Sequence, residues 1–173
     1  SMPVVSHVSS EVVAQPSQRA VPAGPPAFGA PNYRNLDFWG LPAKAKTALN
    51  EKGVTELYPW QAECLSRPGI MDGSENLLYS APTSGGKSLV ADIILARRFA
   101  AKPGSMAMFV LPFVALCEER ANSLEAFFSG MDFRLKRMYG GRGGAFPSPD
   151  PKTNTLLVLT PERANQVTSR LLE

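Results

Sequence analysis

One short stretch constrains the fold of this chain more than any other: residues 80–92 read SAPTSGGKSLVAD. Two glycines, a lysine and a serine stand in a row between an apolar run and a segment of helical periodicity. A tight turn that leaves the lysine in solvent is the alternative, but it gives no reason for a lysine and a serine directly after the glycines. A strand, a glycine-rich loop and a helix that begins at the lysine account for all of these residue types.

Each residue type in this loop suits the binding of phosphate. Gly85 and Gly86 let the backbone turn so that successive N–H groups converge on phosphate oxygens, and a helix beginning at Lys87 adds the positive end of its dipole. Lys87 can reach the β and γ phosphates, and the Ser88 hydroxyl can ligate Mg²⁺. Apart from an alanine in first place, the stretch fits G-x-x-x-x-G-K-[ST], which predicts a nucleoside triphosphate site. The predicted binding residues are Ala81, Pro82, Thr83, Ser84, Gly85, Gly86, Lys87, Ser88 and Leu89.

Strand and helix patterns alternate along the rest of the chain. Strand-length segments occur at 75–80, 105–111, 132–139 and 155–160, and helical periodicity or helix-start signals occur at 38–52, 59–67, 87–101, 114–128 and from 161 onward. This order predicts an α/β fold with a parallel sheet. We expect one helix to end at Lys52, and we expect Met106 and Met108 to fill the core from a strand.

Composition separates the first 35 residues from the others. Residues 1–35 contain no Leu or Ile, only three charged side chains and six prolines. Such a segment buries too little apolar surface to offset its chain entropy, which predicts a disordered leader at 1–35 and an ordered domain at 36–173. The net charge of +3 permits a nucleic-acid partner without requiring one, and no apolar run approaches the roughly 20 residues of a membrane span.

Further motifs flank the glycine loop. They are YPWQAECL (58–65), FVLPFVALCEE (109–119), YGGRGG (139–144) and TPERAN (160–165). Together with NLLYSAPTSGGKSLVA (76–91), they resemble the first RecA-like domain of superfamily 2 DNA helicases. Within that superfamily they are most similar to the helicase-like region of the DNA polymerase theta family, with the HELQ (archaeal Hel-type) helicases as the near alternative.

The resemblance implies a P-loop ATPase motor that moves along single-stranded DNA or repair intermediates, with ATP and Mg²⁺ as ligands, a second RecA-like domain as partner and a nuclear location. It implies that Gln61 reads the adenine edge, since a side-chain amide offers both a donor and an acceptor. Backbone N–H groups and hydroxyls near strand ends and helix starts would contact DNA phosphates. The nucleic-acid residues it implies are Pro112, Phe113, Gly141, Arg142, Thr160, Pro161, Glu162 and Arg163.

The sequence departs from the family pattern in one respect. The 173 residues contain no D-E-x-[HD] box, the source of the carboxylates that hold Mg²⁺ and orient the attacking water. We therefore expect an incomplete domain, the first half of the first motor domain, that is nearly inert as an ATPase by itself. A non-hydrolysing nucleotide- or nucleic-acid-binding module and an RNA helicase of the same superfamily are the alternatives.

Overall fold

The computed structural model describes residues 12–13, 31–82, 85–148 and 150–172, with the backbone alone at 12–13 and 170–172. The described residues fall into two compact units. The first contains residues up to Leu41 together with Gly53–Arg98, and the second contains Pro42–Lys52 together with the chain from Phe99 onward. Most of the predicted leader (1–11 and 14–30) lies outside the described residues, so the leader stays a prediction.

The first unit is built from short elements. They are the strand β1 (Val12–Val13), the 3-10 helix η1 (Leu36–Trp39), α2 (Pro59–Ser66), the strand β2 (Tyr79–Ser80) and α3 (Lys87–Ala101), whose last residues belong to the second unit. β1 and β2 pair in parallel. α3 buries Val90, Ile93 and Ala96, which recur every three residues and so lie on one helix face. The predicted helix at 87–101 is therefore confirmed.

The helix expected to end at Lys52 is present, since its last residue is Glu51 and Lys52 is its C-cap. It does not extend back over the apolar spacing that starts at Phe38, because the chain turns at Gly40. Gly40 ends η1 in the left-handed region with φ of 59°. Pro42 follows and disfavours helical backbone at the residue before it. The helix, α1 (Ala43–Glu51), then begins in the second unit.

The strand expected at 75–80 is shorter than predicted. Only Tyr79–Ser80 is extended and paired. The preceding residues form a turn in which the Asp72 carboxylate accepts hydrogen bonds from the N–H and the hydroxyl of Ser74. The Glu75 N–H donates to the Gly69 carbonyl at 3.0 Å, so this part of the backbone bonds locally instead of in a ladder.

A parallel three-stranded sheet forms the centre of the second unit. The unit contains α1, β3 (Met106–Val110), α4 (Val114–Phe127), β4 (Phe133–Met138), β5 (Asn154–Leu159) and α5 (Pro161–Leu172). The strand order is β3-β5-β4, and both pairings are parallel. All six residues of β5 are buried, as expected for a strand with neighbours on both sides and side chains covered on both faces. The predicted α/β fold with a parallel sheet is confirmed.

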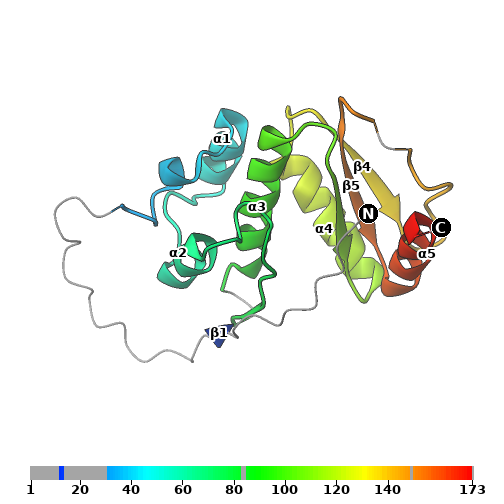
Figure 1. Cartoon of the computed structure of the whole chain (residues 1–173), viewed down its shortest axis with the longest axis horizontal. Helices are drawn as coiled ribbons and strands as arrows, with labels where there is room; N and C mark the ends of the chain where they lie inside the picture. The colour runs from blue at the N-terminus through cyan, green and yellow to red at the C-terminus, as the bar shows by residue number, and fades with distance from the viewer. Residues whose placement is uncertain (1–11, 14–30, 83–84, 149, 173) are drawn as a thin grey trace. The chain divides into compact units, whose positions relative to one another are not determined.

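Helices cover the two faces of this sheet. Val167 of α5 packs in one apolar cluster with Leu157, Leu159 and Met138. Successive side chains of a strand point to opposite faces, so Leu156 and Val158 lie on the other face. Figure 1 shows α4 and α5 on opposite sides of β4 and β5.

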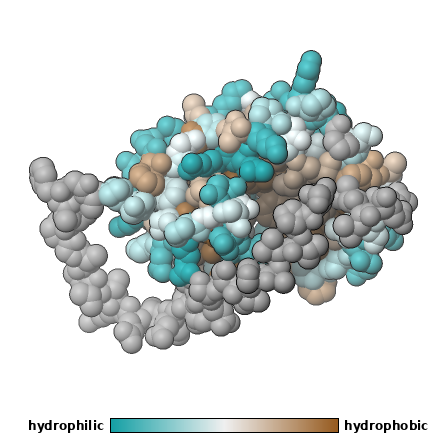
Figure 2. All heavy atoms as spheres, in the orientation of Figure 1, coloured by the Kyte–Doolittle hydropathy of each residue, from teal (hydrophilic) through white to brown (hydrophobic). Residues whose placement is uncertain are grey.

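β3 lies at the edge of the sheet, and this position corrects one expectation. Met108 is 40% exposed and Val110 is 46% exposed, so Met108 is not a core residue, whereas Met106 packs against the apolar cluster. An outer strand leaves one flank uncovered, which periodicity alone does not reveal. Apolar surface is visible among hydrophilic groups in Figure 2. None of the helices in the described ranges is long and apolar enough to cross a membrane.

Asn154 connects three segments of the second unit from the start of β5. Its amide nitrogen donates to the carbonyls of Phe99 and Asp132, both at 3.3 Å, and its oxygen accepts from the Ser105 N–H at 3.1 Å. The side chain is 7% exposed, so its partners would lose their bonds without regaining water.

Replacing Asn154 by alanine should therefore lower the free energy of unfolding by about 2–4 kcal/mol. Urea denaturation of the purified chain measures this loss. Asn165→Ala removes an exposed amide from α5 and should change stability by less than about 0.5 kcal/mol. Equal effects of the two substitutions would contradict the role given to Asn154.

Candidate nucleotide-binding and nucleic-acid sites

The glycine loop lies between β2 and α3, as the sequence predicts. Gly86 has φ of +71°, and a Cβ atom there would lie 2.8 Å from Gln61 Nε2. A Cβ at Gly85 would lie 3.0 Å from the Pro82 carbonyl oxygen, which accepts the Gly85 N–H at 2.9 Å. Conformation and space both favour glycine at residue 86, and space favours it at residue 85. The predicted residues Thr83 and Ser84 lie outside the described residues.

Lys87 folds back over the loop that precedes it. Its Nζ donates to the carbonyl oxygens of Ala81 and Pro82, each at 2.8 Å. The Tyr79 hydroxyl donates to the carbonyl of Lys87 at 2.8 Å, which joins β2 to the first turn of α3. The ammonium group is therefore held at the loop by neutral carbonyls, which a phosphate would replace with charged acceptors.

Gln61 binds the loop from α2. Its Oε1 accepts the Tyr58 N–H at 2.8 Å, and its Nε2 donates to the Gly86 carbonyl at 2.9 Å. The same carbonyl accepts the Leu89 N–H at 3.1 Å. Only 1% of Gln61 is exposed. Its amide keeps one further N–H and one further lone pair, so adenine recognition stays a prediction.

The residues present fit a triphosphate with its Mg²⁺. A loop with a left-handed glycine leads into the N-terminus of a 15-residue helix, whose dipole favours anions. Lys87 and Ser88 both stand in the first turn of that helix, and the Ser88 side chain is exposed. These groups would hold the phosphates and contribute one hydroxyl ligand to the metal.

The role of Gln61 in the empty loop can be tested with Gln61→Glu, which keeps the shape of the side chain. The introduced carboxylate would face the Gly86 carbonyl, and burial beside an acceptor raises the pKa of a carboxyl group. We expect a loss of about 2 kcal/mol at neutral pH. A carboxyl with a raised folded-state pKa binds its proton better when folded, so this loss should shrink as the pH falls toward 5.

Urea denaturation without nucleotide at both pH values is the measurement. Gln166→Glu, an exposed position on α5, is the matched control and should cost almost nothing. If Gln61 served only to recognise adenine, Gln61→Glu would leave the stability of the nucleotide-free chain unchanged. That result would contradict the structural role of Gln61.

The predicted nucleic-acid residues meet at one edge of the sheet in the second unit. They follow the ends of β3, β4 and β5, and the register places Val110 and Met138 opposite Leu159. Because the strands are parallel and in register, the loops after them leave at the same edge, where parallel α/β sheets carry their binding loops. The described residues at this edge include Pro112, Phe113, Gly141, Arg142, Thr160, Pro161, Glu162 and Arg163.

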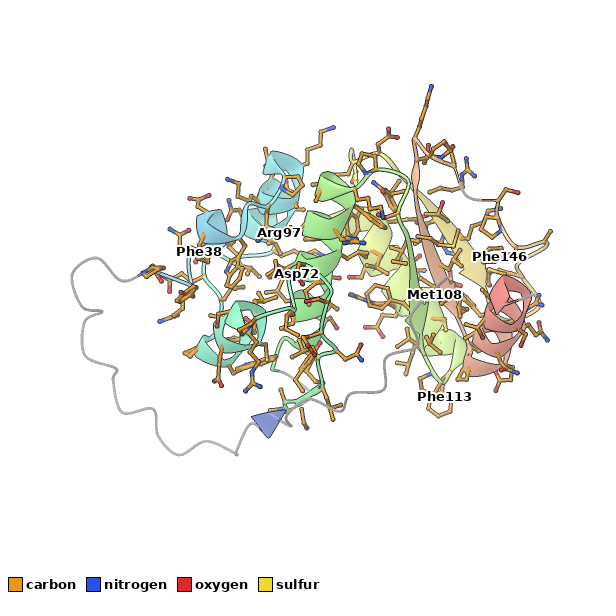
Figure 3. The ribbon with its side chains drawn as sticks, in the orientation of Figure 1. Phe38, Asp72, Arg97, Met108, Phe113 and Phe146 are labelled. Atoms are coloured by element: carbon orange, nitrogen blue, oxygen red, sulfur yellow. The ribbon has the colours of Figure 1, made fainter. Side chains whose placement is uncertain are left out.

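Phe113 is the most exposed large apolar side chain among these residues. It is 66% exposed, directly before α4, and Figure 3 shows its ring projecting outward. Pro112 is exposed beside it. Thr160, in contrast, is only 9% exposed. Its hydroxyl hydrogen-bonds to the Glu162 carboxylate, and this bond lowers the pKa of Glu162.

The two arginines at this edge already have partners in the protein. Arg142 Nη1 lies 2.9 Å from Glu118 Oε2. Arg163 donates to the Gln166 side chain at 2.9 Å and to the Gly143 carbonyl at 3.3 Å. A pocket of about 420 Å³ opens beside Arg163 and is lined by residues 143–146 and by α5. Direct contact of these arginines with nucleic acid stays a prediction.

Sequence reasoning missed an ion-pair network on α4 and β4. Arg137 makes a bidentate contact with Glu125 at 2.8 and 2.9 Å, and its Nε lies 3.8 Å from Glu118 Oε1. Glu118 also accepts the Tyr139 hydroxyl at 3.0 Å; burial first, and this bond second, raise the pKa of Tyr139. Arg137 is thus ion-paired to α4. No local sequence pattern joins residues 12 to 24 positions apart, so only the fold reveals the network.

A glycine loop between a strand and a helix, in a chain with a parallel α/β sheet, defines a P-loop nucleotide-binding protein. Residues 58–173 match the sequence profile of the DEAD/DEAH box helicases, and the chain belongs to this family. The family predicted from the motifs is confirmed.

Relatives with similar sequences agree with this assignment. The chain is 35% identical over 138 residues to the helicase POLQ-like protein of Drosophila melanogaster and 36% identical over 135 residues to DNA polymerase theta of Mus musculus. These matches cover 79% and 78% of the chain but only 13% and 5% of the relatives. ATP-dependent DNA helicase Hel308 of Pyrococcus abyssi is 44% identical over 77 residues, which is 44% of the chain and 10% of that protein.

Solved structures show the same fold. A DEAD box protein from the hyperthermophile Methanococcus jannaschii superposes with a TM-score of 0.60 and 20% identity, covering 80% of this chain and 38% of that chain. Saccharomyces cerevisiae Dbp5 superposes with a TM-score of 0.58 and 13% identity over 80% of this chain and 35% of its own. At this level of identity the likeness concerns the fold alone.

Proposed function

We propose that this chain is the ATP-binding part of a DNA helicase or translocase motor that acts on single-stranded DNA in repair. The observation that carries the proposal is the glycine loop, with Lys87 and Ser88 in the first turn of α3 and Gln61 bonded to Gly86. Sequence identity to both DNA polymerase theta and POLQ-like helicases supports DNA as the track. The same resemblance leads us to propose a nuclear location.

The chain's own residues would divide the work at the nucleotide site. When bound, ATP would supply the γ-phosphoryl group that is transferred to water, and Mg²⁺ would neutralise charge on the phosphate oxygens. Lys87 would exchange its carbonyl partners for phosphate oxygens, and Ser88 would ligate the metal ion. Gln61 would keep the loop in place through its bond to Gly86. The Leu89 N–H donates to the Gly86 carbonyl and so closes the first turn of α3, the turn that would face the phosphates.

The strand-end loops of the second unit would contact the DNA backbone. Phe113 could stack on a base, because its ring is exposed and every base has a π-face. Arg142 and the glycine N–H groups beside it would follow phosphates without reading sequence. Such binding is salt-sensitive and indifferent to sequence.

The alternatives differ in what the chain does after it binds nucleotide. A HELQ-type repair helicase would use the same site, and a binding module would hold ATP without any motor. An RNA helicase of the same superfamily would prefer RNA, so comparison of DNA and RNA strands of one sequence separates that reading from ours.

Nucleotide binding is tested by titrating the chain with a fluorescent ATP analogue in the presence of Mg²⁺. Lys87→Ala should weaken affinity by about 10- to 100-fold, because a charge-assisted hydrogen bond contributes roughly 1.5–3 kcal/mol. Lys152→Ala removes an exposed lysine from another loop and should leave the affinity unchanged. An affinity that both substitutions leave intact would contradict the assignment of the site.

Steady-state hydrolysis tests the second half of the proposal. The 173 residues include no D-E-x-[HD] box, so the chain lacks a carboxylate of that kind to orient water. We propose that the chain alone binds ATP with almost no turnover, and that a complete motor adds this box and the arginine fingers of a second RecA-like domain. Release of phosphate above background, abolished by Lys87→Ala, would overturn this expectation.

A further inference from the structure

The only charged side chain of the glycine-rich loop at 140–144 is held by α4. Arg142 is 61% exposed, yet its guanidinium lies 2.9 Å from Glu118, whose carboxylate also accepts the Tyr139 hydroxyl. The loop backbone is anchored on both sides of Arg142. The Arg142 N–H donates to the Tyr139 carbonyl at 2.9 Å, and Arg163 donates to the Gly143 carbonyl. Release of Arg142 therefore needs only a change of side-chain rotamer.

The surroundings of Glu118 allow this release at low cost. The Glu118 side chain is 41% exposed, and exposed ion pairs are weak because water screens them. Arg137 Nε lies 3.8 Å from the other carboxylate oxygen, so Glu118 keeps a cation and the Tyr139 hydroxyl when Arg142 leaves. A backbone phosphate can accept a guanidinium in a bidentate geometry, whereas Arg142 contacts Glu118 through one nitrogen and one oxygen.

We propose that Glu118 attenuates nucleic-acid binding by holding Arg142 in an ion pair that must break before the guanidinium contacts a backbone phosphate of single-stranded DNA. Glu118 is thus a positioning residue: it acts on the strand through Arg142. The proposal rests on the proposed function, since it requires that the loop at 140–144 contact a strand.

The test measures binding of the chain to fluorescein-labelled oligothymidylate by anisotropy over a range of salt concentrations. Glu118→Gln keeps an acceptor for Tyr139 and should tighten binding about 2- to 5-fold at low salt. Arg142→Ala should weaken binding and lower the slope of log K against log[salt] by about 0.7, the value for one phosphate contact on a single strand.

A double-mutant cycle separates release of Arg142 from simple loss of a negative charge. In the Arg142→Ala background, Glu118→Gln should have no more effect than Glu125→Gln. Glu125→Gln is the matched control, because it removes a charge from the same helix but frees Arg137 instead of Arg142. Thermal melting of each variant confirms that the fold is retained.

The outcomes distinguish this inference from the proposed function. In one case Glu118→Gln tightens DNA binding equally in the Arg142→Ala background, and in another Glu125→Gln tightens it as much. Either result would overturn the inference but leave the proposed function intact. The same holds if Arg142→Ala weakens binding while Glu118→Gln does not tighten it. A wild-type chain that does not bind the oligonucleotide, or that loses nothing on Arg142→Ala, would overturn the inference together with the DNA-contacting role of this loop.

Discussion

The hydrogen bond from Gln61 to Gly86 ties α2 to the end of the nucleotide loop that leads into α3. It joins two segments 25 residues apart, and Gln61 itself is 1% exposed. Removing its amide leaves the Tyr58 N–H without its partner and leaves the Gly86 carbonyl with the Leu89 N–H alone. A Cβ atom at residue 86 would lie 2.8 Å from Gln61 Nε2, and the positive φ there also favours glycine. Glycine at this position thus lets the Gln61 amide approach the backbone directly before Lys87. A residue proposed to recognise adenine therefore also has a structural task in the empty loop.

A second constraint acts in the sheet of the other unit. β5 is buried on both faces and begins at Asn154, so its register with β3 and β4 cannot shift without breaking the hydrogen bonds of the buried Asn154 amide. That register brings the loops after β3, β4 and β5, which are far apart in the sequence, to one edge of the sheet. The loops proposed to bind nucleic acid thus depend on the residues of the sheet for their position.

Much of this architecture was predictable, because the signals are local. The helix at 87–101 follows a glycine loop and carries one apolar stripe, and Pro59 at the first position of α2 marks its start. The split at Gly40 was not predictable from periodicity, since Leu41 continues the apolar spacing across the break. The exposure of Met108 and the ion pairs of Glu118 could not be predicted without the fold. The exposure depends on which strand is outermost, and the ion pairs depend on side chains brought together from separate elements.

The electrostatics of the proposed DNA edge favour weak and reversible contacts. Arg142 faces Glu118, Arg163 bonds to a neutral carbonyl and an amide, and the carboxylate of Glu162 stands in the first turn of α5, where it competes with phosphate for the helix dipole. A surface selected only for affinity would present these cations unpaired. A motor that steps along a strand must release each phosphate as well as bind it, and a tightly held backbone would slow every step. Glu118 beside Arg142 and Glu162 at the start of α5 would meet that requirement without altering the loops, because they would lower the gain from a phosphate contact while the sheet still aligns the loops in space.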